Sequence, residues 1–309
     1  MHRRAPQRFS TPVAKPPARA FAAVIAANAA LAFGPWFVRM ADTGPVAAAF
    51  WRILLAAPLL CVAAFASGAR PGRLTGSLWA LLAISGVAFA ADLGFWHLGI
   101  VRTTLANATL FGNSATLIFP VYGFLVARAW PGRAQGAALL LALSGGALLL
   151  GRSYQLDPRH LGGDLLCLLA GILYALYFIL MLRVRATMAS LPALALATLA
   201  SILPLLAFAM LLGERIVPHA WGSLIGLALV SQVVGQGLMI YALGQLSPLV
   251  IGIALLTQPI VAGAIGWVVY DERLGAPDLV GVALVAAALV LVRRTPRLAP
   301  AVPPMAEDA

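Results

Sequence analysis

Apolar residues run almost without interruption through this chain, in stretches as long as a membrane-spanning helix. Such a helix needs about 20 residues to cross a hydrocarbon core about 30 Å thick. Breaks at Gly, Pro and charged clusters separate ten runs, which are Ala20 to Val38, Pro45 to Ala66, Ser77 to Leu98, Thr104 to Val126, Ala134 to Leu150, Asp164 to Leu182, Leu191 to Leu212, Trp221 to Leu243, Leu249 to Tyr270 and Leu279 to Val292. None alternates with the two-residue period of a lipid-facing strand. The pattern therefore predicts an all-α integral membrane protein with ten transmembrane helices.

Composition agrees with this fold class and excludes a water-soluble one. Hydrophobic residues make up 62% of the chain and charged residues 10%, against about 25% charged residues in soluble domains. The net charge of +11 could suggest nucleic acid as a partner. However, all basic residues except Lys15 are arginines, and most lie beside apolar runs. They are better explained by membrane orientation, so we expect lipid and no nucleic acid around this chain.

The polar segments divide the chain into two units of five runs. We expect a disordered, basic cytoplasmic tail at residues 1–19, a first five-helix repeat at 20–150, a loop at 151–163, a second repeat at 164–292 and a cytoplasmic tail at 293–309. The first apolar run is too long for a signal-peptide core, and many further runs follow it. We therefore expect that the first apolar run is not cleaved from the chain.

The arginines also predict an orientation. If every run crosses, the segments on the side of the two tails hold more than twice as many Arg and Lys residues as those on the other side. Cytoplasmic segments carry this excess. The sequence thus predicts a multi-pass protein of the inner (plasma) membrane with both termini cytoplasmic.

The two units align with each other when one is shifted by 145 positions. Gly99 then falls on Gly244, and Asn113 falls on Gln258. An odd number of crossings per unit means that the second unit enters from the opposite face, as in the inverted repeats of many secondary transporters. The alignment therefore predicts two inverted five-helix repeats.

Several short motifs carry a resemblance to a known family. They are Phe33-Gly34-Pro35-Trp36 in the first run, Phe50-Trp51-Arg52 in the second, and Gln258-Pro259 followed by Tyr270-Asp271-Glu272-Arg273-Leu274 in the ninth. With the run count and the repeat, the chain resembles the EamA-type members of the drug/metabolite transporter superfamily. The resemblance implies two five-helix repeats and export of amino acids, related metabolites or amphipathic drugs. Asp271 stands where the family usually has Gly, and Val126-Ala127-Arg128 of the first repeat has no acidic residue.

Two ionisable residues lie well inside the predicted spans. Arg52 and Asp92 each fall about 10 Å below the outer boundary at 1.5 Å per residue. Buried charges of this kind face a partner or an aqueous cavity. We expect the two to pair or to share water. Asp92 is then either a site for a proton or a cationic group of the solute, or half of a structural ion pair.

A set of amides and aromatics forms the second group of candidates. Asn113 and Gln258 lie near the middle of equivalent spans, and Pro120 and Pro259 each remove a backbone donor close to them. Primary amides can hold zwitterionic or hydroxylated solutes, or they can simply hydrogen-bond between packed helices. The predicted solute-binding residues are Asn28, Trp36, Asn113, Tyr174, Tyr177, Gln232, Gln236 and Gln258. We expect Trp96, near a span end, to be an interfacial anchor.

No motif points to enzyme chemistry. Cys61 and Cys167 lack ligand spacing, the histidines form no HExxH motif, and no phosphate-binding loop is present. We therefore expect no cofactor, no metal site and no enzymatic activity. The small-residue pattern from Gly222 to Gly226 fits either a homodimer or packing within one bundle.

The function that the sequence favours is secondary transport of small organic solutes by alternating access. The family resemblance implies that the direction is export across the inner membrane. A passive channel and an intramembrane lipid-modifying enzyme are the alternatives.

Overall fold

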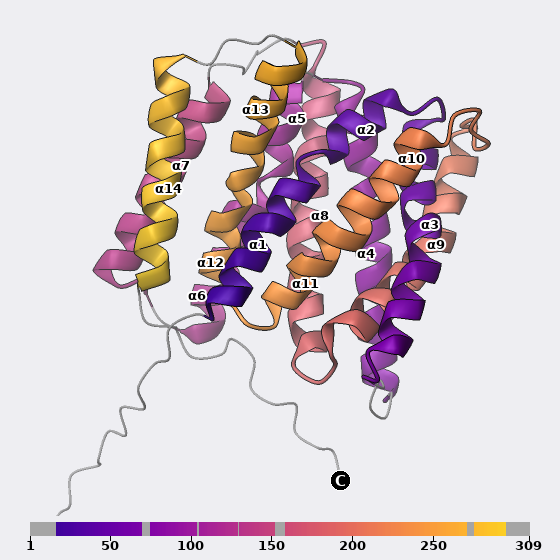
Figure 1. Ribbon diagram of the computed structural model, residues 1–309, viewed down its shortest axis with the longest axis horizontal. Coiled ribbons are helices and arrows are strands. Elements are labelled where there is room, and N and C mark those ends of the chain that lie inside the picture. The colour runs from indigo at the N-terminus through magenta and orange to yellow at the C-terminus, as the bar shows by residue number, and fades with distance from the viewer. Residues whose placement is uncertain are drawn as a thin grey trace, which may run out of the picture.

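The computed structural model describes residues 17–69, 75–103, 105–128, 130–151, 158–270 and 275–294. Within these ranges the chain is helical and contains no strand, as Figure 1 shows. Most of both expected tails, residues 152–157 of the expected loop at 151–163, and Asp271 to Leu274 of the family motif lie outside the described residues.

The helices follow the apolar runs closely. Their bounds are α1 Ala18–Leu31, α2 Gly34–Met40, α3 Pro45–Ala66, α4 Gly76–Ile100, α5 Leu105–Gly112, α6 Ala115–Ala127, α7 Arg133–Gly151, α8 Leu161–Arg185, α9 Ser190–Leu211, α10 Gly222–Gly226, the π-helix η1 Leu227–Gln236, α11 Gly237–Leu243, α12 Pro248–Leu255, α13 Thr257–Tyr270 and α14 Ala276–Arg294. Each run predicted from the sequence coincides with one helix or with consecutive helices. Among the described residues, seven helical stretches are long and apolar enough to span a membrane.

Four of the runs are interrupted, and local chemistry explains the interruptions. Pro35 stands in the first turn of α2, where its missing N–H costs nothing, so it favours a new helix start after α1. The break between α5 and α6 follows Gly112, and the break between α12 and α13 precedes Pro259. The eighth run contains a π-helix, a conformation that is often found at functional sites.

The two halves of the chain interleave in the bundle. α4 packs against both α8 and α9, α3 packs against α9, and α7 packs against α14. Small residues allow close approach at several of these contacts. At Gly86, for example, an added Cβ would lie 2.4 Å from the Cβ of Ala200 on α9. The main core cluster therefore draws its side chains from both halves.

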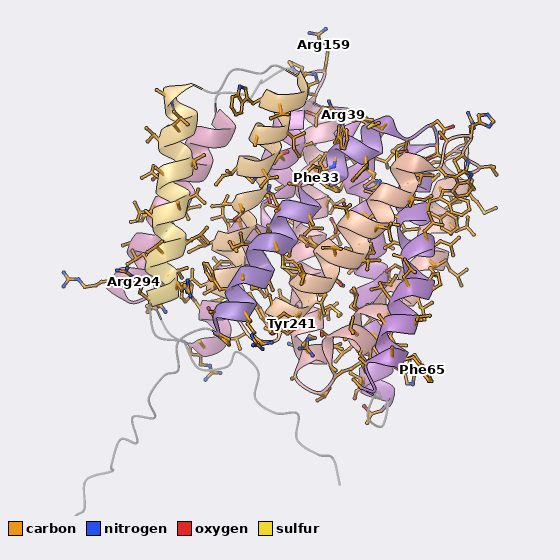
Figure 2. The ribbon with its side chains drawn as sticks, viewed as in Figure 1. Phe33, Arg39, Phe65, Arg159, Tyr241 and Arg294 are labelled. Atoms are coloured by element: carbon orange, nitrogen blue, oxygen red, sulfur yellow. The ribbon has the colours of Figure 1, made fainter. Side chains whose placement is uncertain are left out.

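The helix ends define two faces of the bundle. α1 begins and α14 ends at the lower face of Figure 1, and Phe65, Tyr241 and Arg294 mark that face in Figure 2. Arg39 and Arg159 mark the upper face (Figure 2). Since α8 begins directly after Arg159, the second half of the chain starts at the opposite face from the first.

At the upper face, the loop after α9 is hydrogen-bonded to the start of α3. The Glu214 carboxylate accepts from the backbone N–H groups of Val46 (3.3 Å) and Ala47 (2.8 Å). It thereby satisfies donors that every helix start leaves without intrahelical partners. The indole of Trp51 donates to the Ile216 carbonyl at 2.7 Å, which adds a second connection between these segments.

Candidate functional site

A cavity lies between the two halves of the chain. Its walls come from α1 to α5 on one side and from α8, η1 and α13 on the other. The lining residues are Leu31, Ala32, Pro35, Arg52, Phe89, Asp92, Leu93, Trp96, Thr109, Gly112, Asn113, Tyr174, Gln236, Gln258 and Ala262. Both halves thus contribute polar side chains to one space that is otherwise apolar or aromatic.

Arg52 enters the cavity from α3 and is only 2% exposed. Its Nε donates to Gln232 Oε1 at 3.1 Å, and Gln232 Nε2 in turn donates to Thr198 Oγ1 at 3.3 Å. The guanidinium carbon also lies 6.0 Å from the centre of the Phe89 ring, within cation–π range. Gln232, which we predicted from the sequence to bind solute, is not among the residues that line the cavity. It lies behind Arg52 and holds it.

Asp92 faces the same cavity from α4 and is 7% exposed. It is close enough to Arg52 for the two charges to interact, but no direct ion pair joins them among the described side chains. The expected proximity of Arg52 and Asp92 is thus present without direct contact. No hydrogen bond from a described residue reaches the Asp92 carboxylate either.

The predicted amides meet at the wall formed by the two broken helices. Asn113 and Gln258 both line the cavity, one at the break between α5 and α6 and the other in the first turn of α13. Gln258 Nε2 donates to Asn28 Oδ1 at 2.8 Å. Asn28 is fully buried and does not line the cavity; it also donates to the Val24 carbonyl. Asn28 therefore connects Gln258 to α1.

The two tyrosines of α8 occupy different positions. Tyr174 lines the cavity, and its hydroxyl donates to Gln236 Oε1 at 3.2 Å. Tyr177 is fully buried and stacks on Phe89, with ring centres 4.5 Å apart. The expectation that both lie at the cavity thus holds geometrically for Tyr174, whereas Tyr177 supports the wall from behind.

The tryptophans are placed differently from what their sequence positions suggested. Trp96, which we expected to be an interfacial anchor, lines the cavity. Trp36 does not line it and contacts Phe33 and Phe37 instead. An added Cβ at Gly112 would lie 2.9 Å from Trp96 Nε1. The glycine before the helix break therefore makes room for the indole, a relation that only the fold reveals.

The sequence reasoning also missed apolar lining residues. Phe89 and Leu93 lie on the same helix as Asp92, at spacings of three and one residues, and both reach the cavity. The spacing of Phe89, Asp92 and Trp96 by three or four residues was a usable signal for one helix face. Thr109 and Ala262 had no comparable signal, because their positions depend on the paths of the broken helices.

The site offers binding groups rather than an arrangement for covalent chemistry. Its charged and hydrogen-bonding groups are one guanidinium, one carboxyl group, three amides, a phenol, a threonine hydroxyl and an indole N–H, set among aromatic and aliphatic surfaces. Within the described part of the chain, no group of three His, Cys, Asp or Glu residues could hold a metal ion. A small solute with both polar and apolar parts fits these walls best.

Comparisons with known proteins agree with this architecture. Residues 161–294 match the EamA-like transporter family. An uncharacterized transporter from Archaeoglobus fulgidus is 29% identical over 150 residues, which cover 46% of this chain and 50% of that protein, so the chain spans about half the length of that relative. One solved crystal structure is similar with a TM-score of 0.68 at 17% identity, over 88% of this chain and 95% of that one. That similarity concerns the fold alone.

Proposed function

Since the chain belongs to the drug/metabolite transporter superfamily through the EamA-like domain of its second half, we propose that it is a secondary transporter of small organic solutes. The cavity between the halves is its solute site. The solute class named by the resemblance comprises amino acids, related metabolites and amphipathic drugs, and the direction is export across the inner membrane.

The observation that carries this proposal is the origin of the cavity walls. Arg52, Asp92 and Asn113 come from the first half of the chain, whereas Tyr174 and Gln258 come from the second. A site at the interface of two units can open to either side when one unit tilts against the other. A cavity built within one unit would not open in this way.

The helix contacts support an inverted relation between the units. The contact of α4 with α8 in one direction corresponds to the contact of η1 and α11 with α1 in the other. In the same way, the contact of α4 with α9 corresponds to the contact of η1 with α3. Three further contacts, α3 with α9, α6 with α12 and α7 with α14, join equivalent helices to each other. Two units related by a twofold axis in the membrane plane would produce this pattern, and the opposite starting faces of the two halves fit the same relation.

The broken helices suggest where the movement occurs. α6 and α12, at the lower face, pack tightly: a Cβ at Gly252 would lie 2.4 Å from Pro120 Cγ, and one at Gly123 would lie 2.9 Å from Pro248 Cβ. Gly112 and Ala262 line the cavity on the upper-face halves of the same spans. In the proposed cycle, the α6 and α12 contact closes the lower face while the solute exchanges at the upper one.

Counterflow in proteoliposomes tests the proposal. Liposomes containing the purified chain would be loaded with a mixture of unlabelled solutes, and uptake of the labelled compounds would be followed by mass spectrometry. A carrier gives saturable uptake that the internal solute accelerates. Uptake that does not saturate and shows no acceleration would instead indicate a channel, and chemically altered lipid or solute would indicate an enzyme.

A further inference from the structure

The guanidinium of Arg52 and the carboxyl group of Asp92 share the cavity without pairing. Arg52 and Asp92 are both nearly buried, and among the described side chains no ion pair connects them. An unpaired charge out of water is costly, so two opposite charges in one small space normally pair directly. Their separation therefore requires a cause in the surrounding structure and leaves room for a partner.

The cause lies at Gln232. Its Oε1 accepts from Arg52 Nε, and Thr198 anchors its amide nitrogen from α9. Phe89 provides a cation–π contact that holds the guanidinium from another direction. The hydrogen bond to Gln232 uses Nε of the guanidinium. The two terminal nitrogens make no hydrogen bond to a described residue, and their planar fork matches the two oxygens of a carboxylate.

Asp92 offers the complementary chemistry. An ionised carboxylate only accepts hydrogen bonds, so its natural partner is a donor with positive charge, such as an ammonium group. The side chains beside it on α4, Phe89, Leu93 and Trp96, provide an apolar and aromatic wall. The site therefore has an anion-binding end, a cation-binding end and a surface for an uncharged body.

We infer that this cavity selects zwitterionic solutes, with a carboxylate on Arg52 and an ammonium group on Asp92, and that Gln232 is the positioning residue that keeps these two charges apart. The inference rests on the proposed function and narrows its solute class. An amphipathic cation or a simple anion satisfies only one end and leaves the other charge buried without a partner, which disfavours its binding.

A binding panel on the purified full-length chain tests the inference. The panel contains free amino acids, their N-acetyl derivatives, which keep only the negative charge, and the corresponding decarboxylated amines, which keep only the positive one. A ligand that binds the folded state raises the unfolding temperature. We expect the amino acids to raise it and the single-charge analogues to have little effect.

Single and double variants test whether Arg52 and Asp92 bind the two charged groups of the solute. Asp92→Asn and Arg52→Gln should each weaken amino-acid affinity about 30-fold or more, as expected when one partner of a buried charge pair is removed. The double variant R52Q/D92N leaves no buried charge unpaired, so it guards against loss of folding, and it should also lose amino-acid binding. Asp42→Asn removes a carboxylate in a loop at the upper face and should leave the affinity unchanged.

The positioning role of Gln232 has its own readout. Gln232→Leu frees the guanidinium to approach Asp92, so amino-acid affinity should fall. The Q232L/D92N double variant should be no weaker than D92N alone, because both changes destroy the same site. Additive losses would indicate a separate structural role and would overturn this part of the inference.

The outcomes separate this inference from the transport proposal. Equal stabilisation by the single-charge analogues, unchanged affinity in D92N, or no stabilisation by any amino acid would overturn the inference. If counterflow then shows saturable, accelerated exchange of another solute, transport stands and only the zwitterion preference fails. If no solute is bound or exchanged, both fail.

Discussion

At the scale of single residues, the hydrogen bond between Gln258 and Asn28 connects the cavity wall to a buried support. The bond is 2.8 Å long and joins α13 to α1, so it crosses between the two halves of the chain. Asn28 is fully buried, whereas Gln258 faces the cavity. The bond therefore links the packing of α1 to the cavity wall, and it should contribute to the stability of the fold.

A double-mutant cycle measures how much the hydrogen bond between Asn28 and Gln258 contributes to stability. Asn28→Leu and Gln258→Leu should each lower the free energy of unfolding by about 0.6 kcal/mol, and at most about 1.7 kcal/mol, the range measured for hydrogen bonds between membrane helices. Because both changes remove the same bond, the double variant should lose less than the sum. Unfolding in detergent measures the loss, and additive losses would show that the bond contributes nothing.

At the scale of elements, the close contact of α6 with α12 depends on glycine. Gly252→Ala would place a Cβ 2.4 Å from Pro120 Cγ and 2.9 Å from the Thr116 carbonyl oxygen. Relieving this overlap requires the two helices to separate, at a cost of about 1 to 3 kcal/mol. We expect a lower unfolding temperature in detergent.

Gly136→Ala on α7 is the matched control. Nothing lies within 4 Å of a Cβ at that position, which is inside a helix. Alanine is favoured over glycine in a helix interior by about 0.5 to 1 kcal/mol. The control should therefore be neutral or slightly stabilising. A Gly252→Ala protein as stable as this control would contradict the tight contact.

Asp42, in the loop between α2 and α3, makes a pH-dependent contribution to the stability of the fold. The backbone N–H of His219 donates to the Asp42 carboxylate at 2.8 Å, and Ala220 and Arg215 add further stabilisation, so the pKa of Asp42 lies below its ordinary value. A carboxyl group whose pKa is lower in the folded state stabilises the fold above its unfolded pKa of about 3.9, and this contribution disappears as the pH falls through the folded value.

The unfolding temperatures of the natural chain and of Asp42→Asn provide the measurement. Their difference should be constant from about pH 5 to pH 8, where Asp42 is ionised, and should shrink below about pH 4 as the natural side chain is protonated. A difference that changes between pH 5 and pH 8 would point to a different titrating group.

At the scale of the whole molecule, the proposed orientation places Arg159 outside and Phe65 in the cytoplasm. These residues mark opposite faces of the bundle, as Figure 2 shows. In a background with Cys61→Ala and Cys167→Ala, Arg159→Cys should react with an impermeant maleimide in intact cells. Phe65→Cys should react only after the membrane is permeabilised. The reverse labelling pattern would show that the chain has the opposite orientation in the membrane, which would also reverse the proposed direction of transport.

Much of the architecture followed from the sequence alone. Long apolar runs specify helices in a membrane because every backbone polar group must be satisfied within its own segment there. The helix α3, Pro45–Ala66, therefore has the bounds of its apolar run. Charged residues inside a span, such as Arg52 and Asp92, also indicated an internal cavity, because a charge that faces lipid is too costly.

The tertiary structure decided which face of each helix meets the cavity. Gln232 and Gln236 lie four residues apart on η1, yet Gln236 lines the cavity and Gln232 holds Arg52 behind it. Trp96 lines the cavity although we expected it to be an interfacial anchor, and Trp36, which we expected to bind solute, does not line it. In a chain that is apolar on nearly every face, periodicity does not separate lipid from interior, so the packing of neighbouring helices determines what each polar side chain contacts.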